Sequence, residues 1–415
     1  MSNSGRSQYR ILFLTCSTPR NTGSGGEIVS WRLIRSYADL GAVDVVALVP
    51  PGDHVPESLE EVANRTALIE VPHFYFARSR LRNLMLFLRS QVGSEPFRIT
   101  KSQVPQIEPL VNRWLREENY DLVHCDYLST APYRQLCPEL PAILGEHNVE
   151  WQSFGRLADH RRNPLVKAAL KRDSRRTAEW EAKALGSFQH TLVLSSHDRE
   201  LLLMSRPDLE DRISVWPVPV QRRQRTEDLS GRPFTVLILG SLRAIGRLHG
   251  LRWFLREVWG DVRDRIPDAQ LQIVGADPPA DIVERDKQDG IRVHGFVENL
   301  EPILDTVDVC AIPLFVGAGI RVKVLELVSQ EVPCIGTPVA LQGLEWVDGC
   351  SEATDREQWV DELVRAATNR LPLREAAKRG SVELGARHSQ ARAKEHLEKV
   401  ITDLCIGRTQ EVSHG

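Results

Sequence analysis

The segment at residues 313–338 holds the residues whose types and spacing are best suited to chemistry. Its glycine-rich turn consists of Gly317, Ala318 and Gly319, where a helical pattern begins. Backbone amides at the start of a helix attract phosphate, and Arg321 and Lys323 fall within the first turn of the pattern. Glu326 lies one turn beyond Lys323, so a carboxylate and two cations can face one ligand. The segment therefore predicts a pocket for a nucleoside diphosphate, with phosphates on the cations and ribose hydroxyls on Glu326.

The elements around this segment would place it at the edge of a parallel sheet. The apolar run at residues 309–315 predicts a strand before the turn, and residues 332–335 predict a short strand after the helix. Open parallel sheets bind ligands at the carboxyl ends of their strands. A capped surface helix with solvated Arg, Lys and Glu side chains is the alternative for such a motif taken alone, so the rest of the chain must decide.

The composition is that of a globular enzyme or binding protein. The 415 residues suffice for two domains of ordinary size, each with its own core. With 42% hydrophobic residues, 26% charged residues and a net charge of -3, the chain resembles neither a disordered protein nor a globally basic nucleic-acid binder. No apolar run approaches the ~20 residues of a membrane helix. Residues 1–10 lead into a strand rather than a signal peptide, so we expect a cytoplasmic protein.

Strand-like and helical segments alternate along the chain, which predicts parallel sheets covered by helices. The strand patterns of the first half lie at residues 10–15, 43–49, 122–125, 142–144 and 191–194. Those of the second half lie at residues 234–239, 270–274, 291–294, 309–315 and 332–335. The expected fold class is α/β, with two doubly wound Rossmann-like lobes facing across a cleft. The expected boundaries are a first lobe at 1–220, a linker at 221–232, a second lobe at 233–385, and a helix and tail at 386–415 that pack back on the first lobe.

Neither the cysteines nor the acidic residues suggest a metal site. The seven cysteines are odd in number and have no close pairs, which argues against a disulfide framework and a zinc site. No D-x-D pair occurs, and no set of His, Cys and carboxylate residues has metal-ligand spacing. We therefore expect no metal and no cofactor, and thiols that are mostly buried and reduced.

One strongly basic stretch runs from Arg156 to Arg176 and carries eight cations among apolar residues such as Leu165 and Val166. A basic amphipathic helix of this kind can rest on an anionic membrane or grip a phosphorylated acceptor. A solvated helix face is the alternative. No aromatic residues interleave with the cations, so nucleic-acid binding is not expected.

Six short motifs occur in a fixed order along the chain. They are EHNVEW at 146–151, GSL at 240–242, GLRWF at 250–254, LQIVG at 271–275, HGFV at 294–297 and GIRVKVLE at 319–326. In this order they resemble the motifs of the retaining family-4 glycosyltransferases, which have the GT-B fold of two Rossmann-like lobes. Each motif alone is weak, and the ordered set carries the resemblance.

The resemblance implies a role for each matching residue. The implied donor-binding residues are Gly25, Gly26, Ser241, Arg247, Phe296, Val297, Gly317, Ala318, Gly319, Ile320, Arg321 and Glu326. The implied catalytic residues are His147, Lys323 and Arg243, and the implied acceptor-binding residues are Asp126, Asn148 and Trp151. In this scheme His147 reaches the donor sugar, with a histidine that caps a strand end as the alternative. Asp126 orients the acceptor or acts as a base, with a helix cap as the alternative.

Several positions depart from the family pattern. Ala318 stands where the wider family often has a first glutamate, which seven intervening residues separate from the second at Glu326. Ile320 replaces a threonine, and His249 stands where many members have a lysine. A P-N pair is also missing near the start of the second lobe. The phosphate charge would then depend more on Arg243, Arg247, Arg321 and Lys323.

The resemblance implies metal-independent transfer of a sugar, with retention of configuration, from a nucleotide diphosphate-sugar to an acceptor hydroxyl. The acceptor would be a small molecule, a polysaccharide or a lipid-linked glycan. A nucleotide-sugar epimerase of the same fold and a catalytically silent nucleotide-sugar-binding subunit are the alternatives. A nicotinamide dehydrogenase is disfavoured because the glycines at residues 23–26 lack the G-x-G-x-x-G spacing.

Overall fold

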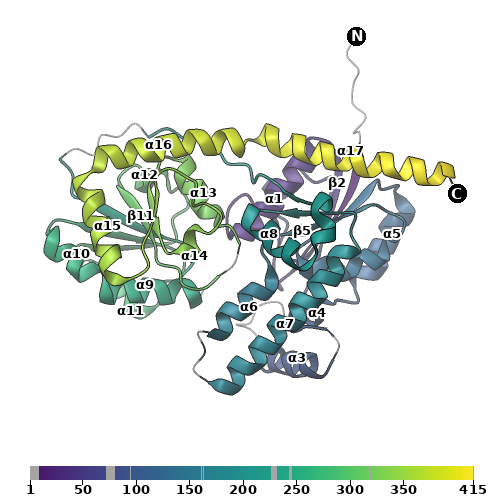
Figure 1. Cartoon of the computed structure of the whole chain (residues 1–415), viewed down its shortest axis with the longest axis horizontal. Helices are drawn as coiled ribbons and strands as arrows, with labels where there is room; N and C mark the ends of the chain where they lie inside the picture. The colour runs from purple at the N-terminus through teal and green to yellow at the C-terminus, as the bar shows by residue number, and fades with distance from the viewer. Residues whose placement is uncertain are drawn as a thin grey trace, which may run out of the picture. The chain divides into compact units, whose positions relative to one another are not determined.

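The computed structural model describes residues 9–71, 80–93, 95–159, 161, 163–225, 231–242, 245–317 and 319–414. The chain divides into two compact units (Figure 1). Unit 1 comprises Met1–Pro219 and Gln390–Gly415, and unit 2 comprises Val220–Ser389.

The sheet of unit 1 has seven strands within the described residues, and every pair of neighbours is parallel. In sheet order the strands are β3 (Arg65–Glu70), β2 (Gly41–Val49), β1 (Tyr9–Thr15), β4 (Leu122–Asp126), β5 (Ala142–Glu146), β6 (His190–Val193) and β7 (Ile213–Val215). All residues of β4 and β5 are buried. Such continuous burial is expected of central parallel strands, because helices cover both faces of the sheet.

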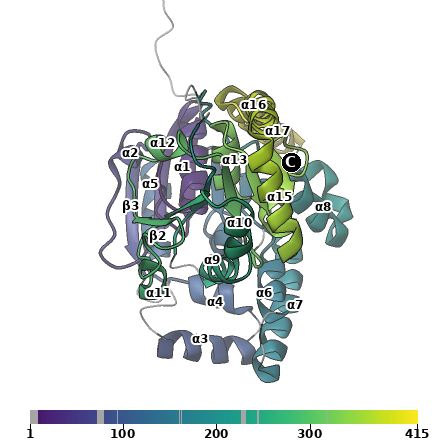
Figure 2. The ribbon, with the colours of Figure 1, turned by 90° about the vertical axis from the view of Figure 1, so that its left-hand side faces the viewer.

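The helices of unit 1 follow most of its strands. They are α1 (Gly25–Ala38), α2 (Glu57–Glu60), α3 (Arg80–Val92), α4 (Phe97–Ser102), α5 (Ile107–Glu117), α6 (Glu150–Asp159), α7 (Pro164–Gly186), α8 (Ser196–Ser205) and α17 (Gln390–His414), with 3-10 turns at Leu128–Leu136 and Pro207–Arg212. Helices α3, α6 and α7 extend to one end of unit 1, away from β5 (Figure 1, Figure 2).

Unit 2 is built in the same way on a smaller sheet, which has six parallel strands among the described residues. In sheet order these are β10 (Ile291–Gly295), β9 (Gln270–Val274), β8 (Thr235–Leu239), β11 (Val309–Ile312), β12 (Cys334–Gly336) and β13 (Cys350–Glu352). Its helices are α9 (Ile245–Glu257), α10 (Trp259–Arg265), α11 (Ala280–Val283), α12 (Glu301–Leu304), α13 (Val322–Ser329), α14 (Pro338–Leu341), α15 (Arg356–Thr368) and α16 (Arg370–Arg387). The predicted α/β class with two doubly wound lobes is confirmed.

The segment that the sequence singled out differs from its prediction at both boundaries. Strand β11 ends at Ile312 rather than at Phe315, because Pro313 has no amide hydrogen for the sheet. Helix α13 begins at Val322 rather than at the glycines. Gly317 and Gly319 have φ values of 154° and 74°, which lie outside the helical region. The glycine turn is therefore an irregular loop that ends at Arg321, the N-cap of α13.

The basic stretch forms two helices instead of one. Asn163 caps a new helix by accepting hydrogen bonds from the amides of Leu165 and Val166, and Pro164 occupies the first helical position. The stretch is thus divided between α6 and α7. None of the helices in the described part of the chain is both long and apolar enough to cross a bilayer.

The chain returns to unit 1 after α16. Helix α17 packs against α1, where Gln390 Nε2 donates to Asp39 Oδ2 at 3.0 Å and to Ser36 Oγ at 3.2 Å. Part of the segment expected to be a linker belongs to unit 2, since the amide of Arg223 donates to Ser329 O and its guanidinium pairs with Asp305 at 2.8 Å.

Candidate functional site

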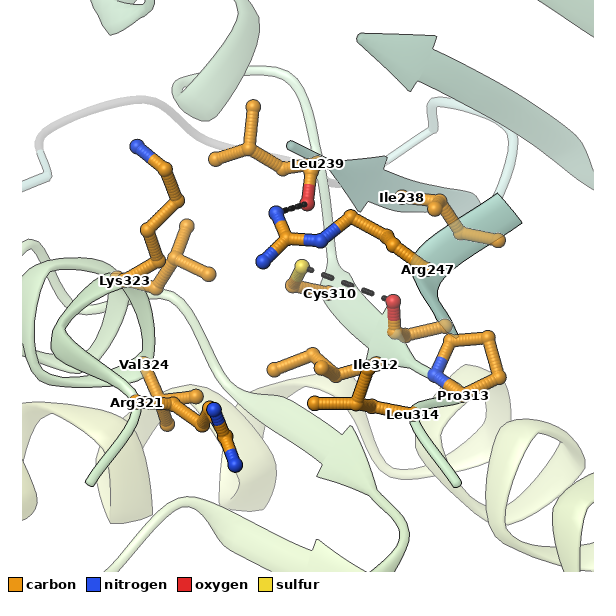
Figure 3. A pocket seen from close by; sticks show the side chains of 12 residues that line it. Ile238, Leu239, Arg247, Cys310, Ile312, Pro313, Leu314, Arg321, Lys323 and Val324 are labelled. Carbon is orange, nitrogen blue, oxygen red and sulfur yellow. Dashed lines mark hydrogen bonds between the residues drawn. The ribbon is translucent and has the colours of Figure 1, made fainter. Parts of the chain in front are cut away.

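A pocket lies at the carboxyl ends of β8 and β11 in unit 2 (Figure 3). Its empty volume is about 490 Å³, including the part open to solvent. Its lining residues are Ile238, Leu239, Arg247, Cys310, Ala311, Ile312, Pro313, Leu314, Arg321, Lys323, Val324 and Leu327. The floor is apolar, and the only charged side chains in this lining are three cations. The pocket therefore suits an anion at the ligand-binding edge of a parallel sheet.

Arg247 enters the pocket from α9 and lies across it from Lys323 (Figure 3). Its Nη1 donates to the carbonyl of Leu239 at 3.3 Å, which ties the guanidinium to the end of β8. Gly240 makes room for this contact, because a Cβ at Gly240 would lie 1.4 Å from Arg247 Nη1. Burial lowers the pKa of Arg247 from its usual value, so an anion in the pocket would stabilise its charged form.

The start of α13 brings two further cations into the pocket. Arg321 is the N-cap and Lys323 is the second residue of the helix, and no acidic residue occupies the first turn. Because the N-terminus of a helix already carries partial positive charge, cations there are unfavourable without an anion nearby. Acidic side chains ordinarily stabilise the N-terminus of a helix, whereas cations occupy it here. Cations at a helix N-terminus suit the binding of phosphate.

The loop before α13 is shaped by its glycine and by a threonine. A Cβ at Gly317 would lie 2.6 Å from Arg321 Nη2, so this position leaves space for the guanidinium. Thr337 Oγ1 donates to the carbonyl of Leu314 and holds the loop from the side of β12. The sequence pattern did not indicate this role for Thr337.

The remaining donor-binding predictions have different locations. Glu326 is half-buried on α13, and neither it nor Ser241 is among the residues that line the pocket. Ile320 is 8% exposed and packs inward. Phe296 is 75% exposed and follows β10 with Val297, at the edge strand of the sheet. Their donor roles stay predictions, and Arg243 and Ala318 lie outside the described residues.

The other group of predicted site residues lies at the carboxyl ends of β1, β4 and β5 in unit 1. These strands are adjacent in the sheet, with Asp126 of β4 opposite Gly145 of β5. His147 follows β5 directly, and its Nε2 lies 2.7 Å from Asp126 Oδ1. Topology thus brings together two residues that are 21 positions apart in the chain.

The carboxylate of Asp126 is completely buried and has several partners. Its Oδ2 accepts from Ser30 Oγ at 2.6 Å and from Thr15 Oγ1 at 3.0 Å, while Oδ1 faces His147. Burial would raise the pKa of Asp126, but attraction to His147, the nearby His124 ring and the hydrogen bond with His147 outweigh it. The pKa is therefore held below its usual value, and the carboxylate stays charged. The hydrogen bond with His147 gives Asp126 the geometry of a residue that orients this imidazole, and its predicted acceptor role stays a prediction.

Tyr127 and Asp126 fix the imidazole of His147 from two directions. The rings of Tyr127 and His147 lie 3.8 Å apart at 32°, and Tyr127 has a φ of 73°. A positive φ is uncommon for a tyrosine and marks a constrained position. Nδ1 of His147 is buried and has no hydrogen-bond partner in the part of the chain that the structure describes. Such an atom calls for a partner from outside the chain.

The glycine loop after β1 is ordered by a capping box. Ser24 caps α1 by accepting from the Glu27 amide, and the Ser24 amide donates to Glu27 Oε2 at 2.7 Å. Gly26 lets α1 approach Tyr127, because a Cβ there would lie 2.2 Å from the Tyr127 hydroxyl. The predicted donor contact of Gly25 and Gly26 stays a prediction.

The two remaining acceptor predictions lie at the start of α6. Trp151 is half-buried and packs against the hydrophobic core of unit 1. Asn148 is half-buried, and its side chain hydrogen-bonds to Glu150. Both residues have structural partners, and their acceptor roles stay predictions.

A buried acidic cluster lies beside His147 and was not predicted. It consists of Glu146, Glu150, Glu181 and Asp198, each at most 2% exposed. Arg98 pairs with Glu150 at 2.9 Å, and Glu181 Oε1 accepts from the Glu150 amide at 3.0 Å. Burial and the neighbouring carboxylates raise the pKa of Glu146 well above its usual value. Burial raises the pKa of Glu181 to about 8.

Glu181→Gln is expected to raise the free energy of unfolding, relative to wild type, by more at pH 8 than at pH 5. Between about pH 4.5 and 8 the unfolded chain has lost the Glu181 proton and the folded chain retains it, so wild-type stability falls as pH rises. The decline attributable to this group is at most about 1.4 kcal/mol per pH unit. Glutamine keeps the acceptor for the Glu150 amide and removes the titration. Urea unfolding from pH 5 to 8 measures the effect, and Glu179→Gln on the exposed face of α7 is the control. An equal decline in wild type and Glu181→Gln would contradict it.

The residues that sequence analysis missed have weak local signals. Thr15 and Ser30 are ordinary strand and helix residues, and only the sheet order brings them to Asp126. Ser30 lies on α1 four residues after Gly26, and this position was the only sequence signal for a contact of α1 with the site. No group of three or more His, Cys, Asp or Glu side chains suited to a metal occurs among the described residues.

Comparisons with known proteins cover both units. Residues 23–223 match the family described as Glycosyltransferase Family 4, and residues 233–369 match Glycosyl transferases group 1. No curated protein sequence matches the chain significantly.

Several solved structures resemble the whole chain. HepE of Anabaena, solved with UDP and glucose, is 11% identical, with a TM-score of 0.63 over 95% of this chain and 100% of that chain. WaaG, a glycosyltransferase involved in lipopolysaccharide biosynthesis, is 15% identical, with a TM-score of 0.60 over 94% and 99%. The α,α-trehalose 6-phosphate synthase of Burkholderia multivorans is 12% identical, with a TM-score of 0.62 over 96% and 99%. At these identities the likeness establishes the GT-B fold.

Proposed function

The chain is a glycosyltransferase of family 4, and we propose that it transfers a sugar from a nucleotide diphosphate-sugar to an acceptor hydroxyl with retention of configuration and without a metal. The donor diphosphate binds in the pocket of unit 2. We assign to His147 the contact with the donor sugar. The acceptor class is a small molecule, a polysaccharide or a lipid-linked glycan.

One observation carries this proposal, which is the placement of Arg321 and Lys323 at the start of α13 without an acidic residue in the first turn. Arg247 adds a third cation from the opposite side of the same pocket. A diphosphate carries negative charge that matches these three cations and the helix dipole. HepE was solved with UDP, which makes UDP the first nucleotide to test.

The chemical step follows from where charge develops. The bond between the anomeric carbon and the β-phosphate oxygen breaks, and its electron pair stays on the phosphate. Arg247, Arg321 and Lys323 stabilise that charge, which is the role often taken by a metal. The acceptor oxygen bonds to the anomeric carbon on the face that the phosphate leaves, and its proton passes to a phosphate oxygen. His147, oriented by Asp126, contacts the sugar during this exchange.

Selective stabilisation by one nucleoside diphosphate in the presence of EDTA tests the proposal. UDP, GDP, dTDP and ADP are added separately to the purified protein, and the shift in thermal unfolding is measured. A ligand at 100 times its dissociation constant contributes roughly 2.7 kcal/mol of stability. The matching nucleotide-sugar is then incubated with the protein, and release of the nucleotide is followed by chromatography.

The outcomes separate the alternatives. A shift that survives EDTA, followed by slow release of nucleotide, supports metal-independent cleavage of the donor bond. A shift that appears only with Mg²⁺ overturns the metal-independent part. No shift with any nucleotide overturns the donor pocket. A shift without release of nucleotide from the matching nucleotide-sugar favours a catalytically silent nucleotide-sugar-binding subunit. The anomeric configuration of the product, measured by NMR once an acceptor is in hand, decides between retention and inversion.

A further inference from the structure

Helix α3 exposes an apolar stripe at one end of unit 1. Met85, Leu88 and Val92 lie at i, i+3 and i+7 on this helix, and they are 55%, 56% and 92% exposed. The sequence of α3 contains no acidic residue, and Arg89 is exposed beside the stripe. An exposed apolar stripe flanked by positive charge is typical of a helix that lies in a membrane interface.

A second exposed stripe on α7 adjoins the first. Leu165 is 79% exposed near the start of α7, and Arg172 and Arg175 continue the same face at i+7 and i+10. Arg172 Nη1 donates to the carbonyl of Gln91, next to Val92, at 2.9 Å. This hydrogen bond places α7 beside the end of α3, at the end of unit 1 where both helices lie in the two views (Figure 1, Figure 2). We call Met85, Leu88, Arg89, Val92, Leu165, Arg172 and Arg175 the arm surface.

The contacts of the basic stretch show which cations have structural partners. Arg176 donates to the carbonyls of Ser90 and Gly93, both at 2.6 Å, and so holds the end of α3 on α7. Lys167 and Lys171 pair with Asp159 at 3.6 and 3.1 Å. These contacts join α3 and α6 to α7. The apolar stripe of α3, which the sequence pattern did not single out, supplies the exposed contact.

We propose that the arm surface docks unit 1 on the surface of an anionic lipid bilayer. The apolar side chains enter the boundary between headgroups and acyl chains, and Arg89 and Arg175 face the lipid phosphates. Charge complementarity selects a lipid surface, since a partner for this surface must offer both apolar area and negative charge. The docking is peripheral. Such docking would bring the protein to an acceptor at the membrane surface, and this consequence rests on the proposed function.

Vesicle co-sedimentation of the full chain tests the proposal. Wild type is mixed with phosphatidylcholine vesicles and with vesicles that contain about 30% phosphatidylglycerol, at about 50 and 500 mM NaCl. We expect binding to the anionic vesicles at low salt and much weaker binding to the neutral ones. The double variants Leu88→Ser/Val92→Ser and Arg89→Glu/Arg175→Glu should each weaken binding about tenfold or more.

The matched control is Leu371→Ser/Val382→Ser, which replaces two exposed apolar side chains on α16, 76% and 51% exposed, and should leave vesicle binding unchanged. Thermal stabilisation by UDP is measured in every sample, so a failure of docking is distinguishable from a failure of the donor site. Absence of wild-type binding to anionic vesicles overturns the proposal. So does equal binding of the control and the α3 variant, or a wild-type dimer that Leu88→Ser/Val92→Ser converts to monomer without a change in vesicle binding.

Discussion

Lys323→Ala is expected to weaken binding of the preferred nucleoside diphosphate by about 10- to 100-fold, because it removes a charge-assisted contact from a partly enclosed site. Lys323 stands at the second position of α13, where the helix dipole and Arg321 already add positive charge. The loss is expected in the bound state, where the Lys323 ammonium faces the diphosphate. Isothermal titration with the nucleotide gives the affinity, and thermal unfolding without nucleotide shows whether the fold is retained.

The control for this variant is Lys378→Ala on the exposed face of α16 in the same unit. It removes the same charge from unit 2 at a distance from the pocket lining, so a general electrostatic effect would appear in both variants. Arg247→Ala, on the opposite side of the pocket, should also weaken binding. Unchanged affinity in both Lys323→Ala and Arg247→Ala would place the diphosphate elsewhere.

The fold could be predicted from the sequence where strands are continuously apolar. Strands β4 and β5 are fully buried and were correctly predicted. Strand β3 was missed because it lies at the edge of its sheet, where its residues are only partly buried and its pattern is weaker. Strands β7 and β13 have three residues each and offer no periodicity. These strands are defined by their neighbours rather than by their own sequence.

The pocket of unit 2 could be located from the sequence because two of its cations are close together in the chain. Arg321 and Lys323 flank one helix start, and local rules suffice to place them. The pair of Asp126 and His147 depends on the neighbouring positions of β4 and β5, which no local pattern specifies. The buried carboxylates of Glu146 and Glu181 were missed for a different reason. Ionisable residues are expected at the surface, and only the packed structure shows which of them are buried.

His147→Ala is expected to lower turnover about 100-fold or more while nucleotide binding changes little. The diphosphate contacts come from unit 2, so they survive the substitution. The loss concerns the transition state, where an oriented polar group near the sugar is typically worth about 10²- to 10³-fold in rate. Asp126→Asn should give a smaller loss of turnover, because it keeps the His147 ring in place but removes the charge that orients it. Donor turnover at saturating nucleotide-sugar and the affinity for UDP are measured on the same preparations.

His190→Ala is the matched control, since His190 lies in the same sheet and also makes one side-chain hydrogen bond, to Ser214 Oγ at 2.7 Å. It lies at the start of β6, whereas His147 follows the end of β5. If His147 only supports the fold, both variants should lose stability and both should keep their turnover per folded molecule. If His147 contacts the sugar, its variant alone loses turnover, and the loss persists at temperatures where both proteins are fully folded. The comparison is informative because each histidine makes one side-chain hydrogen bond, whereas His147 alone lies at the carboxyl end of its strand.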